Sequence, residues 1–571
     1  MLLGKRFVIY GLSRLSVRIS SQLVASRAEV TIIMSTSTDE SLTALLAPAV
    51  KIVPIGPTGL VDAFVDADLS DVECVLALAD GDLENLRAAV LVRRTEPDVP
   101  VVVRAFDPAL ADQLEAGLKV RRAFSVSALA APAFAMATSG HVVLDTVRIA
   151  DGEVPIVQIE IGSGMPLAGL MLTDVKGRHR CAVLAYKRAG GTWTASVSVD
   201  GEVQLQAGDT IVIGGLLADV LTLGAANSRL LAISAAHGRK RTPTQWPWNK
   251  IDGGMRFTLM PRLAAALVAI LIGSVFVFAK SLHLRLVDAI YFVITTATTT
   301  GYGDITLKDS PDWLKLFGGF VMLVGGALLG VVFSQLAAVA TADRLDELMG
   351  RKAARMRGHV IVTGLGNLGY RTAKLLRNVG MPVVVIELTH NTRFSAAVRA
   401  RCPVITGDAR LPEELERAGV RKAAAVIACT NDDLANIQTC LHVRRLNPNA
   451  RVVARMFDES LADRISGAFD IDVALSASTI AAKAFVGAAT DERAFRTINI
   501  EGIQFLACRY TLTAPVTSAQ IDEWRSGGVR ILAWRRAGEP LEPPLQHFPA
   551  LDAGSELVIS GPPEKVLEVT R

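Results

Sequence analysis

The chain has 571 residues, enough for three or four domains at roughly 150 residues each. Apolar residues make up 50% and charged residues 20%, and the mean hydropathy is +0.37, which excludes a disordered or fibrous protein and indicates that part of the chain lies in lipid. Lys and Arg number 60 against 56 Asp and Glu, and the net charge of +4 gives no support for a nucleic-acid-binding protein. The 6 cysteines lie far apart without a C-x-x-C pair, which predicts reduced thiols and no metal site.

The chain begins with a short apolar strand, residues 5–11, that ends at Gly11. This strand is too brief for the apolar region of a signal peptide, so none is predicted. This strand belongs to the region 1–140, which is interpreted below together with its repeat. A smaller β-rich segment at 150–224 and a linker at 225–257 come next.

Two uncharged stretches in mid-chain, 263–279 and 316–342, predict membrane-spanning helices. They belong to a predicted all-α pore module at 258–342, with spans at about 261–280 and about 313–342. The alternative is a pair of buried helices in a soluble protein, although such long uncharged runs are rare there. Basic residues flank both spans, which places both flanking regions in the cytoplasm: Arg239, Lys240, Arg241, Arg344, Arg351, Lys352, Arg355 and Arg357.

Between the spans, residues 287–304 predict a short apolar helix followed by a loop of hydroxyl residues and glycines. Non-helical backbone at membrane depth must be buried in protein or must line water. Gly301 and Gly303 allow successive carbonyls to point one way and replace the hydration shell of a cation, and Thr299 can add a hydroxyl oxygen. The candidate ion-binding segment is Thr299, Thr300, Gly301, Tyr302, Gly303 and Asp304.

This segment resembles the selectivity filter of potassium channels, and the helix, loop and helix resemble their two-transmembrane pore module. The resemblance implies K⁺ as the permeant ion and a homotetramer, because one chain supplies one quarter of such a filter. It also implies that Tyr291 and Phe292 brace the filter. Thr300 departs from the usual Val, which affects the packing behind the filter. A chance match in a loop is the alternative.

Three glycines follow on the second span: Gly325, Gly326 and Gly330. The family resemblance makes Gly325 or Gly326 a gating hinge and Gly330 a small residue near the inner narrowing. Small-residue packing between membrane helices explains them equally well, so both interpretations stay open.

After a linker at 343–357, residues 358–490 begin with a strand, a G-x-G-x-x-G turn, a helix and a second strand that ends at Glu387. Gly364 permits the tight turn, Gly366 lets a phosphate approach, and Gly369 packs the helix on the strand. Glu387 can accept hydrogen bonds from a ribose. The predicted nucleotide site comprises Gly364, Gly366, Asn367, Leu368, Gly369, Glu387, Asp408, Thr430 and Asn431.

Residues 358–490 resemble the RCK domain, the regulator of potassium conductance, also described as TrkA-N-like, and 497–571 resemble its small C-terminal lobe. The resemblance implies an α/β Rossmann-like fold and a ligand such as NAD(H) or an adenine nucleotide. A divalent cation at Asp408, Asp432, Asp433 and Asp458 is an alternative, although acids at strand ends usually cap helices or face solvent. No catalytic constellation follows, so a sensor is predicted and not a dehydrogenase.

The N-terminal half repeats this pattern. Gly56, Asn85 and Arg104 recur 351 residues later as Gly407, Asn436 and Arg455. The chain is therefore a duplicated regulator with a pore module between the copies. In the first copy Ser13 and Ser16 replace two motif glycines and Met34 replaces Glu387, so the first copy is expected to keep the fold without the nucleotide.

Together these features predict a ligand-gated potassium-selective channel in the plasma membrane, with both terminal regions in the cytoplasm and no enzymatic activity. The alternative is a component of a potassium uptake transporter regulated by NAD(H) or ATP, since such systems also use RCK subunits. That alternative predicts several pore loops in a separate membrane chain, whereas here one loop is fused to the sensors.

Overall fold

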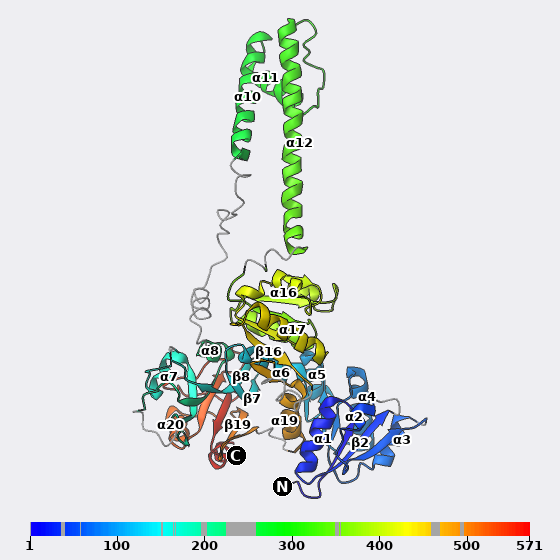
Figure 1. Ribbon diagram of the computed structural model, residues 1–571, viewed down its shortest axis with the longest axis vertical. Coiled ribbons are helices and arrows are strands. Elements are labelled where there is room, and N and C mark those ends of the chain that lie inside the picture. Colours follow the sequence, from blue (N-terminus) through cyan, green and yellow to red (C-terminus); the bar gives the residue numbers. More distant parts are fainter. Residues whose placement is uncertain are drawn as a thin grey trace. The chain divides into compact units, whose positions relative to one another are not determined.

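The computed structural model describes residues 2–35, 40–57, 59–149, 152–163, 165, 167–195, 203–223, 259–348, 353, 356–457, 469–490 and 496–570. The chain forms two compact units, one from residues 1–239 with 350–571 and one from residues 240–349. We treat each unit by itself (Figure 1).

The N-terminal part of the first unit is a six-stranded parallel sheet in the order β3-β2-β1-β4-β5-β6. Its strands are near-continuous apolar runs because helices cover both faces of the sheet. The strands are β1 Arg6–Tyr10, β2 Glu29–Ser35, β3 Lys51–Ile55, β4 Val72–Ala77, β5 Val101–Arg104 and β6 Arg122–Phe124. The helices are α1 Arg14–Ala25, α2 Glu40–Thr43, α3 Leu60–Ala67, α4 Asp82–Thr95 and α5 Pro108–Gly117.

The C-terminal half repeats this sheet in the order β14-β13-β12-β15-β16-β17, again all parallel. This is the Rossmann order, so the predicted duplication of a Rossmann-like domain is confirmed. The strands are β12 Val360–Thr363, β13 Val383–Glu387, β14 Val404–Thr406, β15 Ala425–Ala428, β16 Arg451–Arg455 and β17 Val473–Leu475. The helices are α14 Asn367–Asn378, α15 Ser395–Arg399, α16 Pro412–Arg417, the 3₁₀ turn η2 Val420–Lys422, and α17 Asp433–Leu446.

The two copies exchange a helix. Helix α6, Val126–Ala137, follows the first sheet in sequence, yet its Phe134 is buried in the core beneath the second sheet. Helix α19, Ala477–Thr490, follows the second sheet, and its Phe485 packs edge-to-face on Phe124 in the core of the first, with ring centroids 5.2 Å apart. The two helices lie side by side (Figure 1). Each sheet therefore has its apolar face completed by the other copy.

Each copy ends in a small antiparallel lobe, as the sequence predicts. The first lobe has the strand order β10-β9-β11-β8-β7 and the second β18-β19-β21-β20. The lobes share one core, in which a Cβ atom on Gly214 would lie 2.8 Å from Leu532 Cδ1. Their strands are β7 Val142–Ile149, β8 Gly152–Glu160, β9 Cys181–Lys187, β10 Trp193–Ala195, β11 Thr210–Gly215, β18 Arg496–Ile500, β19 Ile503–Thr511, β20 Arg530–Arg535 and β21 Glu556–Gly561. Their helices are α7 Leu172–His179, α8 Leu217–Leu223, α20 Ser518–Ser526 and α21 Pro563–Val569.

The second unit contains α10 Leu259–Ser281, the short α11 Leu286–Ala297 and α12 Asp312–Leu348. Phe278 of α10 contacts the rings of Phe292 on α11 and Phe317 on α12, so the three helices share one small core. Helices α10 and α12 cover the two stretches predicted to span a membrane.

In the part of the chain that the structure describes, we find no helix with both the length and the apolar character needed to cross a membrane. The two spans stay a prediction. The predicted linker 225–257 lies outside the described residues, as do Arg351, Lys352 and Arg355 of the second linker.

The helix exchange predicts a matched pair of destabilised variants. Phe134→Ala and Phe485→Ala each remove a fully buried ring from the core of the opposite copy, and each should lower the free energy of unfolding by about 3–5 kcal/mol. Urea unfolding followed by tryptophan fluorescence measures the change. Leu434→Ala, at a side chain that is 62% exposed, is the control and should change stability by less than about 0.5 kcal/mol. A Phe485→Ala protein as stable as this control would contradict the exchange.

Candidate functional site

The turn after β12 places two glycines where a side chain would collide with backbone. Gly364 has a φ of +88°, and a Cβ atom there would lie 3.1 Å from Thr430 Cα. A Cβ atom at Gly369 would lie 1.9 Å from the carbonyl oxygen of Gly364, so α14 can approach the turn only because residue 369 has no side chain. A Cβ atom at Gly366 would meet no heavy atom within 4 Å. The space over Gly366 and the first amides of α14 is therefore open to an approaching anion.

A pocket of about 520 Å³ lies beside this turn, at the carboxyl ends of β12, β13, β14 and β15. This is the point where the strand order reverses, and ligands of open α/β sheets bind there. Leu368 and Gly369 do not line the pocket, because both are buried behind its wall. The predicted residues that do line it are Gly364, Gly366, Asn367, Glu387, Asp408, Thr430 and Asn431.

Sequence reasoning missed a basic and aromatic wall of the pocket. Arg393 lies with its guanidinium carbon 4.5 Å from the centre of the Phe394 ring and donates a hydrogen bond to Asn367 Oδ1. Phe394 in turn stacks on Tyr370 of α14, with ring centroids 4.4 Å apart. The available signal was an arginine next to an aromatic residue shortly after the acid that ends the second strand. This wall offers a cation and a flat apolar surface to a ligand.

The acids of the pocket are already engaged with the protein. The Glu387 carboxylate accepts hydrogen bonds from the backbone amides of Leu365 and, at 3.1 Å, of Thr389. Asp408 accepts three hydrogen bonds from the Arg410 side chain, which together hold the pKa of this carboxyl below its usual range.

The described acids of the alternative cation site are bonded to the protein, and one of them is a helix cap. Asp432 caps α17 by accepting from the amides of Leu434 and Ala435, and Asp433 accepts from the amide of Phe457. Asp458 lies outside the described residues. Among the residues with described positions, no cluster of three or more His, Cys, Asp or Glu could hold a metal ion. The capping interpretation therefore fits the structure better than a cation site.

The first copy has serines at the corresponding turn. Ser13 Oγ donates to the carbonyl oxygen of Leu78 at 3.1 Å, and Ser16 Oγ donates to that of Gly11 at 2.7 Å. Both side chains are buried with their oxygens 2.9 Å apart, and each accepts a hydrogen bond from a backbone amide in a capping box at the start of α1. The hydroxyls thus take up space and backbone contacts that the second copy leaves to glycine.

A chain of contacts joins the pocket to the first copy. Asn431, which lines the pocket, accepts a hydrogen bond of 2.7 Å from Arg455 Nη1. The guanidinium of Arg455 lies 4.5 Å from the centre of the Phe457 ring, and that of Arg14, the first residue of α1, lies 3.9 Å from the same ring. A change at Asn431 can therefore reach the serine turn of the first copy through two stacked arginines.

In the second unit, the loop after α11 has the backbone that the glycine pattern predicts. Thr299, Gly301 and Gly303 have φ values of +58°, +48° and +78°, all in the left-handed region. The amides of Thr300 and Gly301 both donate to the carbonyl oxygen of Thr295, at 2.9 and 3.1 Å. No described residue donates a hydrogen bond to the carbonyl oxygens of 299–303. The amides of Thr300 and Gly301 thus bond the end of their own helix, whereas the carbonyl oxygens of 299–303 have no partner in the part of the chain that the structure describes.

Aromatic rings and a glycine hold this loop in place. Tyr302 stacks on Tyr291 of α11, with ring centroids 6.4 Å apart and planes 5° from parallel. A Cβ atom at Gly325 of α12 would lie 2.5 Å from the carbonyl oxygen of Ala297, at the end of α11. Close packing therefore explains Gly325, whereas Gly326 lies near Thr299 and Gly330 has open space around it. The gating role stays a prediction for Gly325, Gly326 and Gly330.

Comparisons with known proteins agree with this division of the chain. The family model described as the TrkA-N domain matches residues 7–126 and 360–477, and the model described as an ion channel matches residues 265–342. The matches coincide with the two Rossmann-like sheets and with the three helices of the second unit. The chain therefore has two TrkA-N domains with an ion-channel domain between them.

Two archaeal relatives match part of the chain. A probable potassium channel protein of Methanocaldococcus jannaschii is 30% identical over 29% of this chain and 50% of its own length. An uncharacterized protein of Methanothermus fervidus is 32% identical over 36% of this chain and 33% of its own length. The chain thus spans between a third and a half of these relatives. Among solved structures, the GsuK channel shares the fold with a TM-score of 0.50 at 16% identity, covering 99% of this chain and 78% of that one.

The two motif glycines should respond differently to the same small change. Gly369→Ala places a methyl group 1.9 Å from a carbonyl oxygen and should lower the free energy of unfolding by about 1–3 kcal/mol, because α14 must shift. Gly366→Ala adds its methyl group in open space, at an ordinary φ of −76°, and should leave stability unchanged. Thermal unfolding of both variants beside the parent protein tests this, and equal losses would show that the turn is not packed as described.

Proposed function

We propose that this chain, in which two TrkA-N domains flank an ion-channel domain, is a potassium-selective channel gated by a cytoplasmic nucleotide. The observation that carries the proposal is the loop Thr299–Asp304, in which Thr299, Gly301 and Gly303 have left-handed backbone and the carbonyl oxygens of 299–303 have no hydrogen-bond partner among the described residues. Backbone carbonyl oxygens that line a pore can replace the hydration shell of K⁺. The proposed filter is Thr299, Thr300, Gly301, Tyr302, Gly303 and Asp304.

One such loop can surround only part of an ion, so the proposed channel is a homotetramer with one loop from each chain. The uncharged stretches 263–279 and 316–342 are proposed to cross the plasma membrane. Two crossings return the chain to its starting side. Because basic residues flank both spans, we propose that this side is the cytoplasm and that both TrkA-N domains lie there.

The pocket of the second copy supports a nucleotide as the ligand. The amides at the start of α14 face the open space over Gly366 and suit a phosphate. Glu387 ends β13, where its carboxylate can accept a hydrogen bond from a ribose hydroxyl. Phe394 offers a stacking surface and Arg393 a cation. NAD(H) and adenine nucleotides both combine these three groups. The first copy, with Ser13 and Ser16 filling its turn, is proposed to serve assembly alone.

A ligand can open a pore only if it binds the open arrangement more tightly than the closed one. A tenfold preference at each of four sites supplies about 5.5 kcal/mol, enough to shift a 1:99 equilibrium to 99:1. The contacts from Asn431 through Arg455 and Phe457 to Arg14 give the pocket a route to the first copy. We propose that nucleotide binding acts on the packing of the two copies by this route.

The filter assignment predicts loss of selective flux from a single methyl group. Gly303 has a φ of +78°, which a residue with a Cβ atom adopts only at a cost of about 1–2 kcal/mol, so Gly303→Ala should misdirect the carbonyls. In liposomes with the full-length protein, K⁺ flux should exceed Na⁺ flux, and the variant should lose that excess. Gly273→Ala on α10, where a Cβ atom meets nothing within 4 Å, should keep it. A parent protein without preference for K⁺ refutes the proposal.

The nucleotide site predicts loss of binding from one added carboxylate. Gly366→Asp puts a negative charge where the phosphate would lie, and like charges in contact cost several kcal/mol, so affinity should fall by at least about 100-fold. Calorimetric titration of the full-length protein with NAD⁺, NADH, ADP and ATP measures the nucleotide affinity. The control is Gly81→Asp, which gives the first copy the helix cap that the second has in Asp432. Unchanged nucleotide affinity in Gly366→Asp would place the ligand elsewhere.

A further inference from the structure

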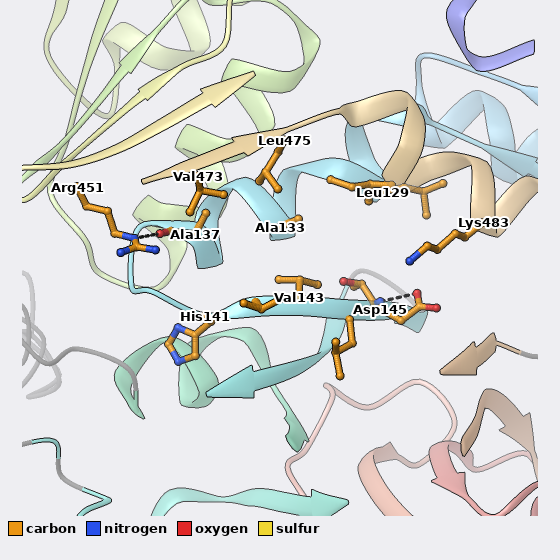
Figure 2. Close-up of a pocket in the computed structure, with 14 residues that line it drawn as sticks. Leu129, Ala133, Ala137, His141, Val143, Asp145, Arg451, Val473, Leu475 and Lys483 are labelled. Atoms are coloured by element: carbon orange, nitrogen blue, oxygen red, sulfur yellow. Dashed lines mark hydrogen bonds between the residues drawn. The ribbon is translucent and has the colours of Figure 1, made fainter. Parts of the chain in front are cut away.

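A second cavity lies where the two copies meet, away from the nucleotide pocket. It has a volume of about 150 Å³ and is bounded by α6 and β7 of the first copy and by β17 and α19 of the second. Figure 2 shows its side chains coming from both copies. The apolar part of the lining is Leu129, Ala133, Val143, Val473, Leu475 and Ile480.

Two cations and one acid are among the residues that line this mainly apolar cavity. Arg451 is half-buried, and its Nε donates a hydrogen bond of 2.6 Å to the carbonyl oxygen of Ala137, which fixes the guanidinium and leaves its two terminal nitrogens for another acceptor. Lys483 lines the opposite end, beside Asp145 (Figure 2). Asp145 is the one carboxylate among the residues that line the cavity, and it lies at the Lys483 end (Figure 2), so no acid of the lining faces Arg451. A half-buried guanidinium beside an apolar cavity without a counter-ion favours the arrival of an anion.

His141 lies at the same end of the cavity as Arg451 (Figure 2). Its side chain is only 4% exposed, and among the residues with described positions its ring nitrogens have at most a weak contact with the backbone of Met136. Burial, with a smaller effect from the Arg451 charge, lowers the pKa of His141 to about 4, so the ring is neutral at physiological pH. A neutral imidazole has one N–H donor and one acceptor nitrogen, so His141 can donate one hydrogen bond at this end of the cavity without adding a charge.

We propose that this cavity binds a small organic monocarboxylate, whose carboxylate lies against Arg451 and whose apolar body lies among the aliphatic side chains. An arginine fork matches a carboxylate through two parallel hydrogen bonds, which a lysine does not reproduce. A cavity of about 150 Å³ accepts a body the size of a benzene ring. This ligand is distinct from the nucleotide in site, size and charge, and it would touch both copies at once.

The test uses the full-length protein with benzoate as the probe and benzamide as its uncharged counterpart of the same shape. Benzoate should raise the midpoint of thermal unfolding in a saturable way, since a ligand that binds only the folded state stabilises it. Benzamide should bind at least about tenfold more weakly, because it lacks the charge-assisted bonds. Equal effects of the two probes would overturn the proposal.

Four variants locate the effect. Arg451→Met should bring benzoate down to the affinity of benzamide, and Arg451→Lys should restore only part of the loss. Arg445→Met removes an exposed charge on α17, outside the cavity, and should change nothing. Because Arg451→Met also loses the bond to Ala137, Ala133→Leu is tested as well. It fills the cavity and should abolish benzoate binding without lowering stability. Benzoate binding that survives Ala133→Leu would refute the site. A loss of benzoate affinity in Arg445→Met as large as that in Arg451→Met would refute it too.

Discussion

The burial of α6 and α19 in each other's copy is the constraint on which the regulatory part of the molecule depends. Phe134 and Phe485 each lie in a core to which the sheet of the opposite half of the chain contributes. Separating the copies would expose both apolar faces at once, so they behave as one body. The cavity at Arg451 and the contact of Arg14 with Phe457 both exist because this exchange brings the copies together.

Within this shared body the two copies have taken different roles through very small changes. Glycine at 366 and 369 lets α14 approach its turn and leaves room above it, whereas hydroxyls at Ser13 and Ser16 fill the corresponding place and bond the backbone. The fold tolerates both because the serine hydroxyls satisfy the donors and acceptors that they bury. One copy thus keeps an open ligand pocket, and the other contributes mainly its helix and its interface.

The features that could be predicted from the sequence are those set by residues close together in the chain. The glycine turn, the strands around it and the loop at Gly301 and Gly303 follow from spacing and backbone freedom, and the structure has them where expected. The exchange of α6 and α19 could not be predicted, because periodicity shows that a helix is apolar all round but not which sheet it covers. The pocket wall at Arg393 and Phe394 was missed for a similar reason, since only the folded turn brings it opposite Asn367.

The exchanged helices also impose an order on biosynthesis. About 340 residues separate the end of α6 from the start of α19, and the predicted membrane segment lies between them. At translation rates of about 5–20 residues per second, the first sheet waits roughly 20–70 s for the helix that covers it. During that interval its apolar face is open to chaperones or to a neighbouring nascent chain. The first half of one chain could therefore pair with the second half of a neighbouring nascent chain in place of its own.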